Sequence, residues 1–245
     1  MHSFFIKPGA VSGDTVLLDI DESRHASKVL RLIPGDTVRL IDGQGHAFEG
    51  SILSCSPGET RVSIGKCLPS HESPVRVTIY EGYPKADKLE FIAQKLTETG
   101  VSALIPLVMR YSVAKPKTGH EERLERISKE AVKQCGRSSF LRIHHPIPFD
   151  KALPLMKEHD LMLMPWENAH ERTILTALRE HPHARDVGIL IGPEGGISPE
   201  EAEAAVSAGA VPVTLGDRIL RTETACVACA VLTMTFLEEQ AEKSK

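Results

Sequence analysis

Two short segments near the carboxyl end of the chain share one pattern, an apolar strand followed by a glycine-containing loop and a helix start. In the first, the apolar run 187–191 predicts a buried strand, which the loop 192–196 with its three glycines ends. In the second, the strand predicted at 211–215 ends at Gly216. This repeated unit predicts an α/β sheet with both loops at the carboxyl ends of strands, where such sheets bind ligands.

Each loop leads directly into a predicted helix. Ser198 and Glu201 form a capping box after the first loop. After the second, Thr222 or Thr224 caps an apolar helix that begins near Arg221. Neither loop has the Lys-Ser/Thr of a Walker loop, and no GxGxxG follows a strand, so we do not expect a nucleoside triphosphate or a dinucleotide. The glycines would instead let a bulky ligand contact backbone N–H and C=O groups.

The rhythm of predicted elements changes once along the chain. Short strands separated by Gly- and Pro-containing turns, with one helix at 22–32, predict a small β-barrel over the first seventy residues. The Pro- and Ser-containing segment 68–74 predicts a linker. Beyond it, strands and helices alternate, which predicts a parallel sheet covered on both faces. We therefore expect two domains, residues 1–70 and 74–245.

The composition is that of an ordinary globular protein, with 41% hydrophobic and 25% charged residues. No stretch approaches the roughly 18 consecutive apolar residues of a membrane span, and the first residues do not resemble a signal peptide, so we expect a cytoplasmic protein that does not enter a membrane. Cys226 and Cys229 form a CxxC inside an apolar run, without a second pair or a nearby His-x-x-His. Buried reduced thiols are therefore expected, and no metal site.

Charge is unevenly distributed along the chain. Residues 110–145 contain nine Lys or Arg against four Glu, an excess of +5 in a chain whose net charge is −4. A basic patch on an acidic protein suits a selective polyanion such as folded RNA, although a solvated helix face explains many such runs. The last predicted helix, 222–240, is apolar nearly all round. Either the sheet of the same chain or a second subunit must cover it.

Several motifs resemble those of one known family. The sequence Gly-Pro-Glu-Gly-Gly at 192–196, followed by Leu-Gly-x-Arg-Ile-Leu-Arg-x-Glu-Thr-Ala at 215–225, is similar to the S-adenosylmethionine site of the SPOUT methyltransferases. Within them it is most similar to the 16S ribosomal RNA uracil-N3 methyltransferase family. Segment 85–100 fits the same pattern, although Thr99 stands where a leucine is expected. The segment 134–137 also fits, with a Cys-Gly pair where a serine-containing pair is commoner.

The resemblance implies more about the fold than spacing does. It implies an α/β SPOUT-type trefoil-knot methyltransferase domain, whereas physical arguments alone would never propose a knot. The pattern His-x-x-x-Val-Leu-Arg at 25–31, followed by Pro-Gly-Asp, resembles the PUA-like RNA-binding barrel that precedes this domain in the family. SPOUT enzymes are dimers with active sites at the interface, so the resemblance also implies a homodimer that acts on 16S ribosomal RNA, within the small ribosomal subunit.

The loop positions and the resemblance together predict the site residues. Cofactor-binding residues are expected to be Met164, Pro165, Glu167, Ile191, Gly192, Pro193, Glu194, Gly195, Gly196, Leu215, Gly216, Ile219, Leu220, Arg221, Thr224 and Ala225. RNA-binding residues are expected to be Arg24, His25, Arg31, Lys85, Arg110, Lys133, Gln134 and Arg137.

Methylation of uracil N3 requires loss of a weakly acidic imide proton and an in-line attack on the sulfonium methyl group. Arg221, always charged and close to a helix start, is predicted to stabilise the uracil anion. Glu223 is a candidate proton acceptor, but its place in the first helical turn equally suits interaction with the helix dipole. The alternatives are a non-catalytic RNA-binding or ribosome-assembly protein with this fold, and a SPOUT enzyme that modifies another RNA.

Overall fold

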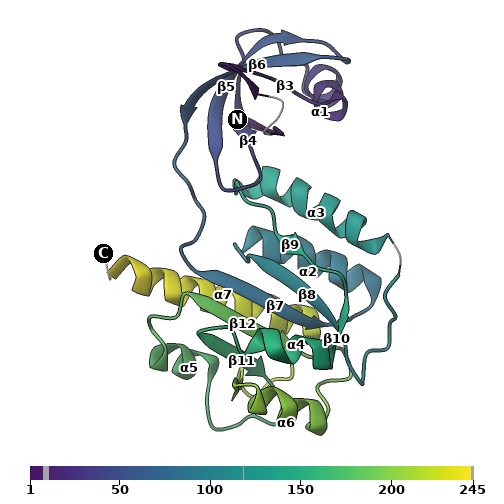
Figure 1. Ribbon diagram of the computed structural model, residues 1–245, viewed down its shortest axis with the longest axis vertical. Helices are drawn as coiled ribbons and strands as arrows, with labels where there is room; N and C mark the ends of the chain where they lie inside the picture. Colours follow the sequence, from purple (N-terminus) through teal and green to yellow (C-terminus); the bar gives the residue numbers. More distant parts are fainter. Residues whose placement is uncertain (8–10, 118, 244–245) are drawn as a thin grey trace. The chain divides into compact units, whose positions relative to one another are not determined.

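The computed structural model describes residues 1–7, 11–117 and 119–243, which form two compact units (Figure 1). The first unit consists of Met1–Glu72 and Lys129–Phe140, and the second of Ser73–Ser128 and Leu141–Lys245. No sequence pattern predicted that Lys129–Phe140 would pack with the amino-terminal segment. The division into domains at residues 70 and 74 stays a prediction.

The first unit is built on one six-stranded sheet. Its strands pair antiparallel except for the first pair, which is parallel. In sheet order they are β1 (His2–Phe5), β4 (Thr37–Ile41), β5 (Ala47–Cys55), β6 (Thr60–Cys67), β3 (Thr15–Leu17) and β2 (Val11–Ser12). Alternate apolar side chains of these strands point into one core, which includes the fully buried Phe4, Leu40 and Val62.

The helix predicted at 22–32 is shorter and begins earlier. It consists of α1 (Ile20–Arg24) and a π-helical turn, η2 (His25–Val29). Asp19 sets the start, because its side chain accepts a hydrogen bond from the Glu22 N–H at 2.8 Å. Arg31 lies just beyond the end in the left-handed region, with φ of 53°.

One carboxylate joins the two segments of the first unit. Glu72 accepts hydrogen bonds from the Arg137 guanidinium, at 3.0 Å from Nη2, and from the N–H groups of Ser138 and Ser139, at 2.7 and 2.9 Å. Burial alone would raise the pKa of Glu72, but these hydrogen bonds and the charge of Arg137 hold it below its usual value. Glu72 is therefore bound as the anion.

We expect Glu72→Gln to lower the free energy of unfolding by about 2 kcal/mol at neutral pH, because Arg137 loses its counter-charge in a buried position. The lowered pKa means that this stabilisation is present above the usual pKa and disappears as pH falls through the folded-state value. Urea unfolding at neutral and acid pH measures both. Glu59→Gln is the control, since Glu59 is exposed and pairs loosely with Arg61 at 3.6 Å. Equal effects of the two substitutions would contradict the assignment.

The second unit is a parallel sheet with helices on both faces, as predicted. In sheet order the strands are β10 (Ile147–Pro148), β8 (Ala103–Val108), β7 (Arg76–Gly82), β12 (Asp186–Ile191), β11 (Leu161–Pro165) and β13 (Ala210–Val213), with β9 (Arg142–Ile143) also paired to β8. The helices are α2 (Ala86–Glu98), α3 (His120–Cys135), α4 (Phe149–Met156), α5 (Ile174–Glu180), α6 (Pro199–Ser207) and α7 (Thr222–Lys243). Only the first part of α3 belongs to this unit.

Alternate residues of the central strands point to opposite faces. Ile79, Leu163 and Ile189 pack in the cluster that contains residues of α2, α5 and α7. Tyr80 and Leu190, one position along their strands, pack with α4 and α6. Strands buried on both faces explain why these segments are apolar throughout rather than alternating. Helix α4 was not predicted from the sequence, and it contains Pro154.

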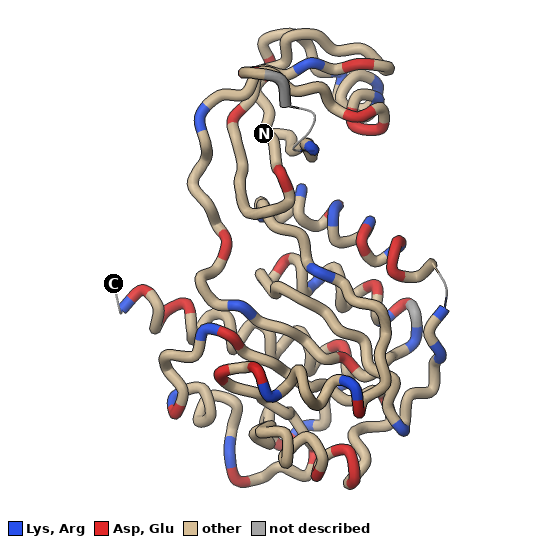
Figure 2. The backbone as a smooth tube through the Cα atoms, in the orientation of Figure 1, with Lys and Arg blue, Asp and Glu red and all other residues tan. Residues whose placement is uncertain are grey.

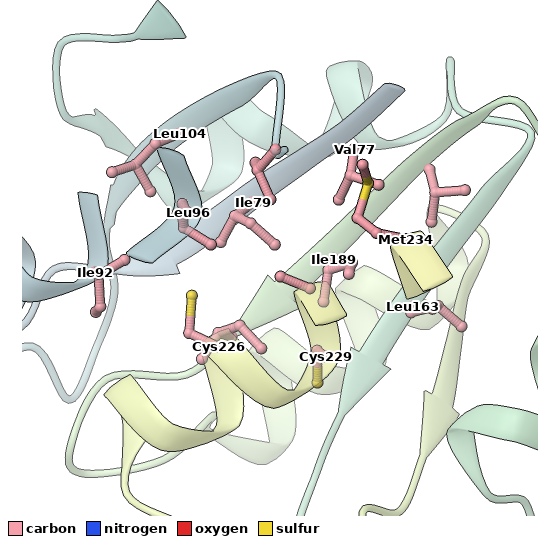
Figure 3. Packing of buried hydrophobic residues seen from close by; sticks show 14 of the residues in the cluster. Val77, Ile79, Ile92, Leu96, Leu104, Leu163, Ile189, Cys226, Cys229 and Met234 are labelled. Carbon is pink, nitrogen blue, oxygen red and sulfur yellow. The ribbon is translucent and has the colours of Figure 1, made fainter. Parts of the chain in front are cut away.

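The apolar carboxyl-terminal helix α7 lies against the α2 side of the sheet (Figure 3). Cys226, Cys229 and Met234 of α7 pack in one cluster with Val77, Ile79 and Ile189 of the sheet, and both cysteines are free and fully buried. Burial raises the pKa of each thiol, so they are inert, reduced core residues, as predicted. Val231 on the same helix is 43% exposed, so the described chain covers α7 only in part.

The described residues contain neither a membrane-spanning helix nor a metal-binding cluster of side chains. No helix among them is long and apolar enough to cross a membrane. No cluster of three or more His, Cys, Asp or Glu in this part of the chain is arranged to hold a metal ion.

Candidate functional site

A cavity of about 770 Å³ lies at the carboxyl ends of β11, β12 and β13. Its walls come from the loops 165–170, 191–197 and 214–221, from the start of α7, and from Lys88 on α2. The volume falls within the roughly 300–1,000 Å³ of pockets for small ligands. Both glycine-containing loops of the sequence analysis are therefore brought together at one site, as their positions after parallel strands predicted.

The loop 192–196, which we call the first loop, is held from two sides. Its turn is closed by a hydrogen bond of 2.9 Å from the Gly196 N–H to the Pro193 carbonyl oxygen. The capping box predicted at Ser198 and Glu201 is present and starts α6 directly after the loop. A Cβ atom at Gly195 would lie only 2.7 Å from the Cβ of Tyr111, so the segment after β8 packs against the first loop. A side chain at Gly195 would displace that segment and not only enter the cavity.

The loop 214–221, which we call the second loop, presents backbone and apolar surface to the cavity. The Thr214 hydroxyl accepts a hydrogen bond from the Gly216 N–H at 3.1 Å, which turns the chain after β13. Gly216 has a φ of 106°, a left-handed conformation that suits glycine, and open space where a Cβ would be. Ile219 is 89% exposed at the cavity wall. Such an exposed apolar side chain at a cavity is available for contact with a ligand.

Thr222, the first residue of α7, connects the two loops. Its hydroxyl oxygen lies 2.7 Å from the Gly192 carbonyl oxygen and 2.7 Å from Oε1 of Glu81, the penultimate residue of β7. Arg221 immediately precedes α7 and its carbonyl oxygen accepts a hydrogen bond from the Ala225 N–H at 2.8 Å. The positive end of the α7 dipole and the Arg221 charge therefore lie together at the cavity.

An ion-pair cluster fixes the other side of the α7 start. Lys88 Nζ lies 3.1 Å from Oε2 of Glu223 and 3.4 Å from Oε1 of Glu194. Burial alone would lower the pKa of Lys88, but its hydrogen bond to Glu223 and the charges of both carboxylates raise it. The three side chains tie α2, the first loop and α7 together. Because Glu223 is held in this ion pair at the start of α7, it is placed for a structural role more than for proton transfer.

Most of the predicted cofactor residues line this cavity. Fourteen of the sixteen do so, namely Pro165, Glu167, Ile191, Gly192, Pro193, Glu194, Gly195, Gly196, Leu215, Gly216, Ile219, Leu220, Arg221 and Ala225. Met164 is fully buried in the core shared with α4 and α6, because side chains alternate along β11. Thr224 is exposed on α7 and does not line the cavity. Cofactor binding by these two residues stays a prediction.

The cavity also has lining residues that the sequence analysis did not single out. They are Lys88, Trp166, His170, Ile197, Thr214, Asp217, Arg218 and Thr222. Most are neighbours of predicted residues in the same three loops, so the loop signal itself could have found them. Lys88 lies on α2, more than seventy residues before the loops; it belongs to the segment 85–100 that fits the family pattern, but that pattern did not place it at the cofactor site.

The predicted RNA-binding residues fall into two groups. Arg24, His25, Arg31, Lys85, Arg110 and Gln134 are exposed. The side chains of Lys133 and Arg137 are engaged within the first unit: Lys133 Nζ lies 2.7 Å from Oε1 of Glu22, and Arg137 is 7% exposed and paired with Glu72. Their part in RNA binding stays a prediction.

In the folded chain, nearby carboxylates offset part of the positive charge of the basic run 110–145. Acidic residues lie among the basic ones along α3 (Figure 2). In addition, carboxylates from elsewhere in the chain pair with its basic side chains, as Glu200 does with Arg110 at 2.9 Å and Glu90 with Arg123 at 2.6 Å. These pairs remove part of the excess charge on which the predicted patch depended.

Comparison with protein families finds two matches along the sequence. Residues 71–234 match the family described as RNA methyltransferase domain, and residues 17–63 match RNA methyltransferase PUA domain. Among curated proteins, ribosomal RNA small subunit methyltransferase E of Bacillus subtilis is 33% identical over 242 residues, which cover 92% of this chain and 93% of that protein. The protein of the same name from Synechocystis is 28% identical, over 91% of this chain and 74% of that protein.

Solved structures of similar proteins include two with the cofactor bound. A ribosomal RNA small subunit methyltransferase E from Neisseria gonorrhoeae, bound to S-adenosyl methionine, has a TM-score of 0.86 at 28% identity, covering 96% of this chain and 97% of that one. A methyltransferase from Legionella pneumophila, in complex with the bound cofactor SAM, has a TM-score of 0.83 at 27% identity and covers 96% of this chain and 98% of that one.

Proposed function

The chain belongs to the RNA methyltransferase family, and from this membership we propose that it transfers a methyl group from S-adenosylmethionine to N3 of a uridine in 16S ribosomal RNA. The predicted fold class is confirmed: a SPOUT-type α/β methyltransferase domain preceded by a small PUA-like domain. The observation that carries the proposal is the single cavity formed by the two loops whose sequences resemble the family's cofactor site.

The cavity has the chemistry that S-adenosylmethionine requires. Adenine and ribose need apolar walls and backbone hydrogen-bonding groups, which Ile219, Leu220 and the glycine-containing loops would supply. The carboxylate of Glu167 also lines the cavity and would favour a cationic ligand. S-adenosylmethionine is a sulfonium and supplies an activated methyl group when bound.

The remaining task of the protein is to position uracil and favour its anion. Arg221 is exposed at the cavity and stands at the positive end of α7. A permanent positive charge gains nothing from a sulfonium but attracts the uracil oxygens more strongly as the N3 proton leaves, so it stabilises the transition state more than either bound reactant. Glu223 is held by Lys88 and is therefore the weaker candidate for the proton acceptor.

The first unit is proposed to bind the RNA. Its exposed residues Arg24, His25 and Arg31 lie on or beside α1 and η2, in a domain whose sequence matches the RNA methyltransferase PUA family at residues 17–63. Lys85, Arg110 and Gln134 remain candidates on the surface. A homodimer would cover the exposed part of α7, and action on ribosomal RNA would place the protein in the cytoplasm.

The experiment that tests this function uses purified protein and small ribosomal subunits from cells that lack it. We expect label from methyl-labelled S-adenosylmethionine to appear in 16S RNA as N3-methyluridine, identified by mass spectrometry of the digested RNA. Naked 16S RNA in parallel reactions distinguishes free RNA from the assembled subunit as substrate. Methylation of transfer RNA or of a ribose oxygen would overturn the assignment, and a protein that binds RNA but not S-adenosylmethionine would be the non-catalytic alternative.

A further inference from the structure

Glu81 is a buried acid next to the cavity that the proposed reaction does not use. It lies on β7, between β8 and β12, and its side chain is 0% exposed. Oε1 contacts the Thr222 hydroxyl, whereas Oε2 is buried without a hydrogen-bond partner among the described residues. No Lys, Arg or His pairs with Glu81 in this part of the chain, which is unusual for a fully buried carboxyl group.

The geometry around Thr222 determines where a proton must lie. The Thr222 hydroxyl oxygen is 2.7 Å from Oε1 of Glu81 and also 2.7 Å from the Gly192 carbonyl oxygen. A hydroxyl group has one proton to donate, and a carbonyl oxygen can only accept. If Glu81 were ionised, two acceptors would compete for one proton. If Glu81 is protonated, it donates to Thr222, Thr222 donates to Gly192, and both short contacts are hydrogen bonds.

We propose that Glu81 is a positioning residue that keeps its proton at neutral pH and, through Thr222, fixes the first loop to the start of α7. The consequence for cofactor binding rests on the function proposed above. Gly192 and Thr222 both line the cavity, so this chain of two hydrogen bonds sets the distance between its walls. The proton of Glu81 thereby sets the shape of the cavity, although Glu81 does not contact the ligand.

The charged and titratable groups around Glu81 favour its neutral form. Burial is the main cause that raises its pKa well above the ordinary value, and the charges of Glu194 and Glu223 act in the same direction. Hydrogen bonds that Thr222 and Cys226 would donate to the ionised form act in the opposite direction. Lys88 is already paired with both carboxylates. The thiols of Cys226 and Cys229 on α7 face Glu81, and their own pKa values are raised by burial, so they stay uncharged.

Raising the pH removes this arrangement. An ionised Glu81 accepts the hydrogen bond of the Thr222 hydroxyl. The Gly192 carbonyl oxygen then has no donor, and the first loop is no longer fixed to α7. Affinity for S-adenosylmethionine should then fall in the alkaline range. Glu81→Gln replaces the acid by a neutral group of the same shape whose NH₂ can donate to Thr222, so it should keep the affinity and lose the pH dependence.

The test compares wild type, Glu81→Gln, Glu81→Ala and Thr222→Val by calorimetric titration with S-adenosylmethionine at several pH values. We expect Glu81→Gln to bind within about threefold of the wild type at neutral pH and with a flat pH profile. Thr222→Val should bind about tenfold more weakly, the effect of losing the hydrogen bond that fixes Gly192 in the first loop. Glu81→Ala should resemble Thr222→Val. A Glu81→Gln profile that falls with pH as the wild type does would overturn the proposal.

Two measurements without ligand keep this proposal separate from the proposed function. Infrared spectroscopy of the wild type at neutral pH should show the carbonyl stretch of a protonated carboxylic acid, absent in Glu81→Gln. In addition, Glu81→Gln should be more stable than the wild type, by a margin that grows as pH rises from the ordinary carboxyl pKa toward the raised one, since only the folded state then holds the proton. Failure to bind S-adenosylmethionine would contradict the proposed function only. Absence of the infrared band would contradict the proposal that Glu81 is protonated.

Discussion

Replacing Ala225 with phenylalanine is expected to abolish useful binding of S-adenosylmethionine, with a loss of affinity of at least about a hundredfold, or roughly 2.7 kcal/mol. Ala225 lies in the first turn of α7 and lines the cavity between the two loops. A phenyl ring there would occupy volume that the ligand needs, and interiors close-packed on the other sides cannot yield it without strain. Calorimetric titration measures the effect directly.

The matched control for this substitution is Thr224→Phe. Thr224 precedes Ala225 in the same helical turn but is exposed and does not line the cavity. It should therefore accept the ring with little change in affinity. The pair also decides between two readings of the motif, because the sequence placed both residues at the cofactor. Loss of binding in Thr224→Phe with normal binding in Ala225→Phe would show that this cavity is not the cofactor site.

The fold was largely predictable because its signals are local. The strand ending at Ile191, its glycine loop and the capping box at Ser198 and Glu201 lie within sixteen consecutive residues, and the structure contains each of them. Periodicity could not reveal α4, an eight-residue helix that contains Pro154. Nor could it suggest the trefoil knot, which entered only through the family resemblance.

The sequence patterns predicted which loops form the cavity, but not which side chains interact there. Lys88 reaches Glu194 and Glu223 across more than one hundred residues of sequence, and Thr222 reaches Glu81 across 141. Nothing in a linear pattern specifies such partners. The same limitation explains why the ion pair of Arg137 was not predicted, because its counter-charge Glu72 lies 65 residues away in the predicted linker. A count of basic residues measures charge, whereas RNA binding depends on which charges remain accessible after the chain has folded.

Arg221→Ala is expected to lower single-turnover methylation by roughly a hundredfold, equivalent to about 3 kcal/mol, while the affinity for S-adenosylmethionine changes only a few-fold. The reason is the position of Arg221 at the cavity and at the positive end of α7. Its charge acts on the uracil anion, which forms only as the reaction proceeds. Rapid-quench methylation of RNA and calorimetry of cofactor binding, on the same preparation, separate the two quantities.

Two further measurements distinguish stabilisation of the anion from support of the loop. Raising the pH should restore part of the lost rate in Arg221→Ala, because a larger fraction of the uracil is then already deprotonated in solution. The cofactor must be saturating, so that an effect of Glu81 on its affinity does not enter. Arg218→Ala removes the same charge from the same loop, also at the cavity, and should reduce the rate far less because Arg218 lies four residues before the helix start. If Arg221→Ala loses rate and cofactor affinity in proportion, or shows no recovery at high pH, then Arg221 shapes the second loop and another residue stabilises the anion.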